Sequence, residues 1–156
     1  MISDGTTVTS QDEFLATARP LLERAFVARF GVRDGMEAAS DAIEYALTNW
    51  QRVSVMDNPT GYLFKVGHGK ANRAIRRSRR MTALASEPIT IDRPLDLDLQ
   101  QALLRLPWEQ RVAVVLVHAH GHSYASAAEL LDIPVTTITN HVQRGMTQLR
   151  KAVTAR

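Results

Sequence analysis

The chain has 156 residues, and its 45% hydrophobic and 22% charged residues are typical of a folded globular protein, which excludes a wholly disordered chain. It has no cysteine, which excludes disulfides, cysteine zinc sites, thiol catalysis and iron–sulfur clusters. The net charge is only +3, no apolar run approaches the roughly 18 residues that cross a bilayer, and the polar segment 1–13 is unlike a secretory signal, so a cytoplasmic protein without membrane insertion is expected.

Helical periodicity dominates the first part of the chain, because apolar residues recur there at three- and four-residue steps. One such stripe consists of Phe14, Leu15, Ala18, Leu21, Leu22, Ala25 and Phe26, and a second of Met36, Ala39, Ile43, Ala46, Leu47 and Trp50. Pro59 can begin a third helix, because the missing N–H of a proline costs nothing in a first turn. The stripe predicted for this helix is Leu63, Val66, Lys70, Ala74 and Ile75.

The third predicted helix is strongly basic. No acidic residue occurs from Asn58 to Ser86, a stretch that holds Lys65, Lys70, Arg73, Arg76, Arg77, Arg79 and Arg80. Because these charges repel one another, an anion is their natural partner. The following stretch from Glu87 to Asp98 is acidic and contains two prolines, which predicts a linker between two globular pieces.

The second piece begins with a leucine-rich segment before Pro107 and continues into a nearly unbroken apolar run, Val112–Val117. Composition alone would allow this run to be a buried strand. A helix is favoured because Glu109, Gln110 and Arg111 give it a polar start and no second strand is in sight to pair with it. The chain is therefore predicted to be all-α.

The segment from Gly121 onward has the spacing of a helix-turn-helix. Ser123 can cap a short helix, Asp132–Pro134 breaks it, and Thr136 or Thr137 can cap a second helix. The polar set predicted for its outer face is Thr136, Thr137, Thr139, Asn140, His141, Gln143 and Arg144. Such side chains can reach base edges or phosphates in a major groove. The alternative is an ordinary helical hairpin with a solvated face.

In their order and spacing these segments resemble the sigma-70 family of transcription initiation factors. The C-terminal piece resembles region 4 through Leu104–Pro107, Arg111, Gly121, Ser123, Tyr124, Ala128, Leu131, Ile133–Ile138, Arg144, Leu149 and Arg150. The N-terminal piece resembles region 2 of the small extracytoplasmic-function (ECF) class through Pro20–Leu22, Ala25, Ala38–Trp50, Asn58, Pro59, Tyr62–Val66, Arg76 and Arg77. A short linker without a middle region is also typical of that class.

The resemblance implies two small helical domains, a region 2-like domain over residues 10–81 and a region 4-like helix-turn-helix domain over 100–156, joined by an acidic linker over 82–99. It implies binding to core RNA polymerase and to the −10 and −35 elements of promoter DNA, without enzymatic activity, cofactor or metal. A monomer is expected when the protein is free. Members of this class are often held inactive by an anti-sigma factor, and no residue here indicates whether one exists.

The resemblance also implies roles for single residues. The −10 contacts would be Arg52, Ser54 and Asp57 in the loop before the third helix, and Tyr62, Lys65, His68, Lys70, Arg73, Arg76 and Arg77 on it. The −35 contacts would be Thr136, Thr137, Thr139, Asn140, His141 and Arg144, and the polymerase contacts Ser40, Asp41 and Glu44. Tyr62 has a second interpretation of equal weight, half-buried packing. The acidic face of the second helix also has a second interpretation, a surface that is simply solvated.

Several positions depart from the family pattern. Family members usually have an acid at Ser40, a glutamine at Ile43, Arg-Asn at His68-Gly69 and glycine at Asp132. These departures leave open a sigma-like regulator that does not initiate transcription. An ordinary helix-turn-helix repressor is a further alternative, and it predicts a stable dimer on a symmetric operator.

Three histidines, His118, His120 and His122, alternate around Gly121. A metal site there is disfavoured, because alternate helical positions point in different directions and no carboxylate lies within three residues. The histidines are the only support for an enzyme.

Overall fold

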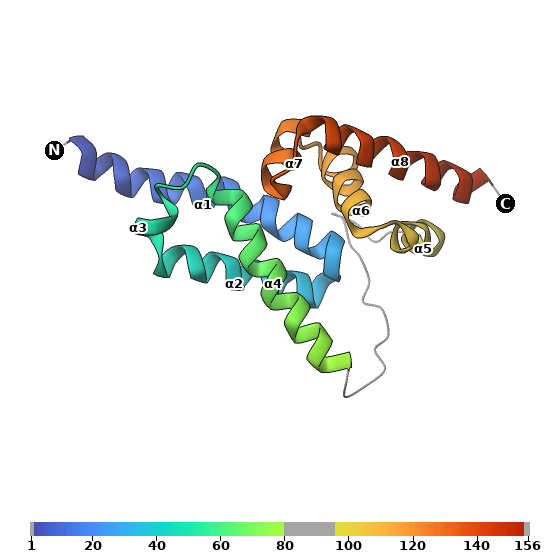
Figure 1. The fold of residues 1–156 in the computed structure, drawn as a ribbon, viewed down its shortest axis with the longest axis horizontal. Helices are drawn as coiled ribbons and strands as arrows, with labels where there is room; N and C mark the ends of the chain where they lie inside the picture. The colour runs from blue at the N-terminus through green and yellow to red at the C-terminus, as the bar shows by residue number, and fades with distance from the viewer. Residues whose placement is uncertain (1, 80–95, 155–156) are drawn as a thin grey trace.

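The computed structural model describes residues 2–79 and 96–154, and the regular elements within these ranges are all helices (Figure 1). The N-terminal piece consists of α1 (Ile2–Phe30), α2 (Val32–Thr48), the short α3 (Trp50–Val53) and α4 (Pro59–Arg79). The C-terminal piece consists of α5 (Leu97–Arg105), α6 (Trp108–Val114), the π-helical turn η1 (Val115–Ala119), α7 (Tyr124–Leu131) and α8 (Val135–Thr154). The all-α prediction is confirmed. None of the helices in the described ranges is both long and apolar enough to cross a membrane.

Local signals set several helix starts. Pro59 begins α4 as predicted, and the Ser123 hydroxyl accepts a hydrogen bond from the Ser126 amide at 3.0 Å, which caps α7. Asp96 caps α5 in the same way through the Leu99 amide, at 2.8 Å. Residues 97–99, at the end of the expected linker, thus belong to α5. Residues 82–95 of that linker and Arg80 lie outside the described residues, as does the side chain of Arg79.

The buried face of α4 differs from the predicted stripe. Leu63 is buried as expected, but its buried neighbours are Phe64, Gly67 and Ala71. Lys70 and Ala74 are exposed, and Val66 and Ile75 are half-buried. The reason is close packing at Gly67, where a Cβ atom would lie 2.6 Å from the Phe26 ring of α1 and 2.7 Å from the Ala38 carbonyl of α2. The helix therefore turns its glycine side toward α1 and α2.

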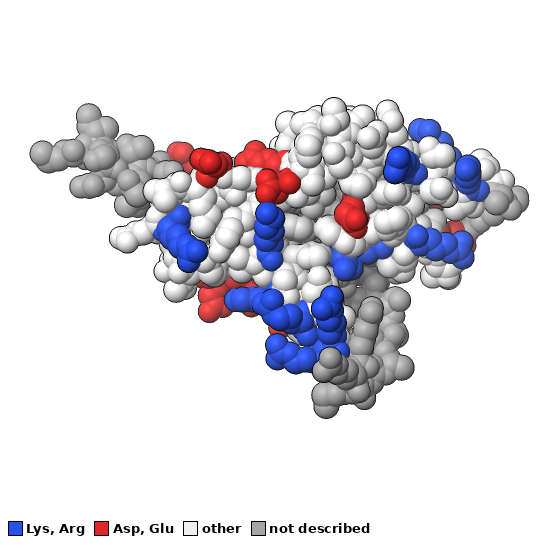
Figure 2. Space-filling model, viewed as in Figure 1, with Lys and Arg blue, Asp and Glu red and all other residues white. Residues whose placement is uncertain are grey.

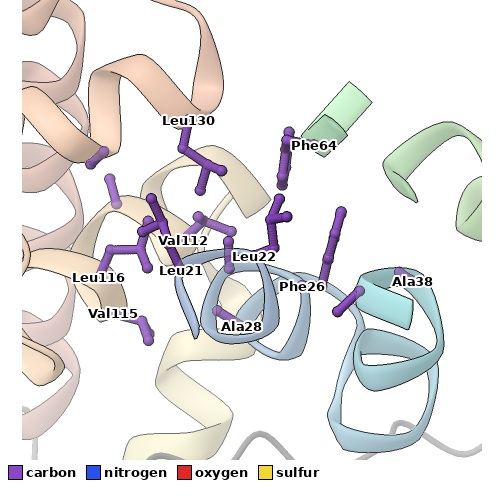
Figure 3. Close-up of a cluster of buried hydrophobic side chains, with 14 of the residues drawn as sticks. Leu21, Leu22, Phe26, Ala28, Ala38, Phe64, Val112, Val115, Leu116 and Leu130 are labelled. Atoms are coloured by element: carbon purple, nitrogen blue, oxygen red, sulfur yellow. The ribbon is translucent and has the colours of Figure 1, made fainter. Parts of the chain in front are cut away.

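The two pieces share one hydrophobic core. Figure 3 shows Leu21, Leu22 and Phe26 of α1 in the same cluster as Val112 of α6, Leu116 of η1 and Leu130 of α7. Phe64 of α4 lies in this cluster as well. The N-terminal and C-terminal pieces are thus packed directly against each other.

This packing explains the unbroken apolar run. Residues 112–116 are all buried, because α6 lies between α1 of the N-terminal piece and α8 of the C-terminal piece, and η1 packs against α1 and α7. A helix covered on two sides needs apolar residues around most of its circumference. The predicted helix is confirmed, and its last turn widens to the π-helical η1.

Arg111 connects the two pieces through backbone carbonyls. Its Nε donates to the Ala28 carbonyl at 2.7 Å and its Nη2 to the Arg29 carbonyl at 3.1 Å, both near the C-terminal end of α1. Its Nη1 lies 3.3–3.5 Å from three carbonyls at the end of α5, those of Leu103, Leu104 and Leu106. Burial, and then the charge of Arg29, lower the pKa of Arg111 to about 10, which leaves it protonated at neutral pH.

Gly67 and Gly69, two of the three glycines of α4, should respond oppositely to alanine. Gly67→Ala should lower the free energy of unfolding by about 1–3 kcal/mol, because the new methyl group collides with Phe26 and the Ala38 backbone. Gly69→Ala should raise it by about 0.5–1 kcal/mol, because a Cβ there would meet only the Arg73 guanidinium at 3.5 Å and alanine favours the helix. Urea unfolding of both variants checks this; equal effects would contradict the packing at Gly67.

Candidate nucleic-acid interface

The C-terminal half of α4 forms a basic surface, which we call the α4 basic patch. Figure 2 shows its blue side chains gathered at the lower end of the molecule. The patch consists of the exposed residues Lys70, Arg73, Arg76 and Arg77. Within residues 2–79 and 96–154, none of the four has a carboxylate within ion-pair distance. Concentrated positive charge of this kind binds polyanions by displacing their condensed counterions.

Lys65 lies apart from the α4 basic patch, in the half of α4 that faces α7. Its Nζ is 2.9 Å from Oδ2 of Asp132, which follows α7. The Nδ2 atom of Asn58 donates to the Glu129 carbonyl at 2.8 Å and lies 3.4 Å from Oδ1 of Asp132. Both Lys65 and Asp132 are exposed. Lys65 is therefore already paired with an acidic group of the C-terminal piece.

His68 lies in an aromatic cluster between the two pieces. Its ring is 4.7 Å from that of Trp108 on α6 and 5.3 Å from those of Phe30 and Phe64. The Nε of Arg29 donates to its Nε2 at 3.3 Å. Burial, and next the charge of Arg29, lower the pKa of His68 to about 4. The structure thus places His68 in the contact between pieces, away from the α4 basic patch.

Tyr62 packs in a pair with Tyr45 of α2. The two hydroxyls are 3.2 Å apart and the ring centroids 5.8 Å apart. The hydrogen bond between the two hydroxyls raises the pKa of Tyr45. Tyr62 is half-buried, which fits the packing interpretation of this residue and leaves part of its surface open.

The loop before α4 is a second exposed feature near Tyr62. Arg52, which the sequence placed in this loop, lies on α3, whereas Ser54 and Asp57 lie in the loop, and all three side chains are exposed. The Ser54 hydroxyl donates to the Gln51 carbonyl at 3.2 Å. The most exposed large apolar residue of the loop is Val55, at 80%. Sequence reasoning considered only the polar residues here and missed Val55. The sequence alone did not distinguish Val55 from Val53 and Met56 of the same segment, which are buried and half-buried.

The helix-turn-helix is formed by α7 and α8. Asp132 ends α7 in the left-handed conformation, with φ at 55°, and Ala127 and Ala128 are buried as predicted. The expected cap at Thr136 or Thr137 is wrong, because α8 begins at Val135 and both threonines lie within its first turn. Pro134 supplies this start, since its carbonyl accepts from the Thr137 and Ile138 amides.

The outer face of α8 presents the polar residues predicted for it. Thr136, Asn140, Gln143 and Arg144 are exposed, whereas Thr137, Thr139 and His141 are half-buried. The Thr139 hydroxyl donates to the Val135 carbonyl at 2.9 Å, so this hydroxyl already has an intrahelical partner. The inner face buries Ile138, Val142, Gly145 and Leu149.

The outer face of α2 combines polar and apolar side chains. Ser40 and Glu44 are exposed, and Asp41 is half-buried beside a hollow that Lys70 of α4 also lines. Met36 and Leu47, which the sequence placed in the buried stripe, are 41% and 54% exposed on this face. That expectation is wrong because the alanines of α2, together with Ile43, already fill the side that packs on α1 and α4. Met36 and Leu47 are candidate interface residues that sequence reasoning missed.

The three histidines do not converge on a metal site. Within the described residues no group of three histidine, aspartate or glutamate side chains is placed to hold a metal ion. His122 instead lies 2.9 Å from the Arg24 guanidinium of α1, so it contributes to the contact between the two pieces. Burial and Arg24 lower the pKa of His122.

Comparisons with known proteins agree with this arrangement. The family model of sigma-70 region 4 matches residues 96–149. The chain is 33% identical over 89 residues to the ECF RNA polymerase sigma factor SigM of Mycobacterium tuberculosis, covering 51% of this chain and 45% of that protein. It is 42% identical over 64 residues to the ECF sigma factor SigE of Mycolicibacterium smegmatis, covering 41% and 25%. The chain thus spans less than half the length of these curated relatives.

A solved structure shares the fold. The sigma factor RpoE from Bartonella quintana, determined in complex with the anti-sigma factor NepR, superposes with a TM-score of 0.63. The superposition covers 92% of this chain and 96% of that one, at 22% sequence identity.

The His68 environment predicts a loss of stability in acid. The pKa of His68 is 6.5 in the unfolded chain and about 4 in the folded one, so below pH 6.5 protons bind preferentially to the unfolded state. Its stabilising contribution is complete above pH 6.5 and is lost as the pH falls to 4. After allowance for its partial exposure, the loss should be about 1–2 kcal/mol.

Urea unfolding at pH 7 and at pH 4.5 measures this loss. Carboxyl groups also change their protonation between these pH values, so the wild type is compared with the variant His68→Phe. This variant keeps a ring between Trp108 and Phe64 but has no titratable group at position 68. The variant should lose less stability than the wild type between the two pH values. Identical losses would show that His68 is not held in its neutral form by the fold.

Proposed function

Because the chain belongs to the ECF group of the sigma-70 family, we propose that it binds core RNA polymerase and directs initiation at promoters with −10 and −35 elements. The observation that carries this proposal is the exposed polar face of α8. This helix is the second helix of a helix-turn-helix inside the segment that matches sigma-70 region 4. Such a helix is suited to the major groove. The protein would perform no chemistry itself and would need no cofactor.

In this proposal α8 reads the −35 element. Its exposed polar residues nearest the turn are Thr136, Asn140, Gln143 and Arg144, and Arg144 is suited to bidentate contact with guanine or to a phosphate. The half-buried Thr137, Thr139 and His141 would contribute at the edges of the contact.

The −10 element would bind along α4 and the loop before it. The α4 basic patch would neutralise phosphates. Tyr62, together with Arg52 of α3 and Ser54, Val55 and Asp57 of the loop, would meet unpaired bases. Base stacking on an aromatic ring contributes about 1–3 kcal/mol. The partial exposure of Tyr62 and the open position of Val55 support this assignment.

The outer face of α2 is the proposed polymerase-binding surface. Ser40, Asp41 and Glu44 are flanked there by the exposed Met36 and Leu47. A mixed face with apolar side chains is more typical of a protein interface than of a purely solvated helix.

Reading both promoter elements requires the two pieces to separate. Elements centred near −10 and −35 lie roughly 25 base pairs apart, which is about 85 Å of B-form DNA. In the packed arrangement Lys65 of α4 contacts Asp132, only three residues before α8 begins. A partner that binds the pieces can hold them together or apart. An anti-sigma factor, such as the one bound to the Bartonella relative, is therefore a proposed partner.

A sigma-like regulator without initiation activity is the second candidate. Its support is Ile43, which stands where the family usually has a glutamine and whose side chain is only 4% exposed. It therefore adds nothing to the polymerase-binding face. This candidate predicts DNA or protein binding without polymerase binding.

Co-purification with core RNA polymerase, followed by run-off transcription from a genomic fragment library, separates the two candidates. Polymerase binding with promoter-dependent transcripts would establish an initiation factor. A folded chain that does not bind polymerase would favour the regulator. Glu44→Lys together with Met36→Lys should weaken polymerase binding at least tenfold if the α2 face is used, because it places two positive charges in the interface.

The α4 basic patch should determine the salt dependence of binding to single-stranded DNA. Replacing Arg73, Arg76 and Arg77 by glutamine should lower the slope of log affinity against log salt by about 2, since each lost phosphate contact removes about 0.7 on a single strand. Arg19 and Arg105, which are exposed elsewhere, provide the control when replaced by glutamine. A slope that is unchanged in the triple variant would place the DNA on another surface.

A further inference from the structure

The helix proposed to read the −10 element, α4, is connected to the C-terminal end of α7, just before α8, the helix proposed to read the −35 element. Figure 1 shows the end of α7 beside the first half of α4. One side chain of α4's first half, Lys65, and that of Asn58, the residue before α4, reach across to this end. Lys65 contacts the Asp132 carboxylate at 2.9 Å, and Asn58 donates to the Glu129 carbonyl at 2.8 Å. We call Asn58, Lys65 and Asp132, with the Glu129 carbonyl, the α4–α7 clasp.

Asp132 is held in place for this contact by the backbone. Its left-handed conformation ends α7, and its amide donates back to carbonyls of α7, including that of Glu129 at 3.2 Å. The carboxylate therefore leaves the end of α7 toward α4. The hydrogen bond and charge of Lys65 lower the pKa of the Asp132 carboxyl, so it is ionised at neutral pH.

The Lys65–Asp132 pair remains in contact with water. The side chains are 64% and 52% exposed, so another anion can approach the ammonium group and replace the carboxylate. The contrast is with the α4 basic patch, whose four residues have no such carboxylate among the described residues. The Asp132 carboxylate is thus paired with Lys65, one of the positively charged residues proposed to bind the −10 strand.

Resting on the proposed function, we infer that Asp132 is an intramolecular competitor of nucleic-acid phosphate for Lys65, so that the packed arrangement blocks part of its own −10 surface. The blocking group is on the helix-turn-helix, so separating the two pieces frees Lys65. By linkage the converse also holds: phosphate bound at Lys65 weakens the α4–α7 clasp by the factor by which the clasp weakens phosphate binding.

The size of the effect follows from the exposure of the pair. An exposed ion pair changes an equilibrium modestly, so release of Lys65 should strengthen DNA binding about two- to fivefold. Such a contact adjusts binding without preventing it. Binding of polymerase or another partner to either piece can break this ion pair at little cost in free energy.

The test measures binding of a fluorescent single-stranded DNA oligonucleotide to the full chain by anisotropy. Asp132→Asn removes the charge and suits the left-handed backbone, which asparagine tolerates. Glu129→Gln is the matched control, because it removes the same charge one turn earlier on α7 and keeps the carbonyl that Asn58 uses. Asp132→Asn should bind two- to fivefold tighter than Glu129→Gln. In a Lys65→Met background the same substitution should bring no gain over that control.

Hydrogen exchange of the wild type supplies a second readout. Adding the oligonucleotide should speed exchange of the Asp132 and Ile133 amides, and it should not do so in Lys65→Met. The inference is overturned if Asp132→Asn binds no tighter than Glu129→Gln, if its gain persists without Lys65, or if no variant binds DNA at all. Polymerase binding is measured separately on the same variants and tests the proposed function. Absence of polymerase binding in every variant would contradict the proposed function, whereas the DNA-binding comparisons test the α4–α7 clasp.

Discussion

The arrangement of this protein depends on one buried guanidinium that satisfies the ends of two helices. Arg111 donates to carbonyls at the end of α1 and approaches those at the end of α5. The last carbonyls of a helix have no intrahelical partner and carry partial negative charge. They therefore compensate the cation without a carboxylate. Because α1 belongs to one piece and α5 to the other, this interaction fixes the position of the pieces relative to each other.

The contacts around Arg111 follow from that position. With α6 held against α1, Trp108 reaches the ring of His68, and Arg29 lies over Trp108 at 5.2 Å. The apolar run beginning at Val112 then completes a core shared by both pieces (Figure 3). At the other side of the contact, Arg24 meets His122 and Lys65 meets Asp132. The interface thus combines a dry aromatic and aliphatic centre with polar pairs at its margin.

This packing divides the candidate surfaces into open and covered ones. The α4 basic patch, the outer face of α8 and the outer face of α2 remain exposed. Lys65 and His68, on the same helix as the basic patch, are instead engaged by the C-terminal piece. His68 and Asp132 are also two of the positions at which the sequence departs from the family pattern. These two departures therefore lie in the contact between the pieces.

The sequence by itself determined the local structure. Pro59, Ser123 and the Asp132–Pro134 break set helix ends through interactions between near neighbours, and the helix-turn-helix and the all-α fold follow from them. Only the tertiary structure decided which sides of the helices are buried. Periodicity did not indicate that Gly67 faces Phe26, because a glycine has no hydrophobic side chain and its role is to admit another helix. Nor did it indicate the role of Arg111, whose partners are backbone carbonyls up to 83 residues away in sequence and carry no side-chain signature. The packing of the two pieces rests on these contacts of Gly67 and Arg111. They join residues that are far apart in the sequence and close in the folded chain, so spacing along the chain does not reveal them.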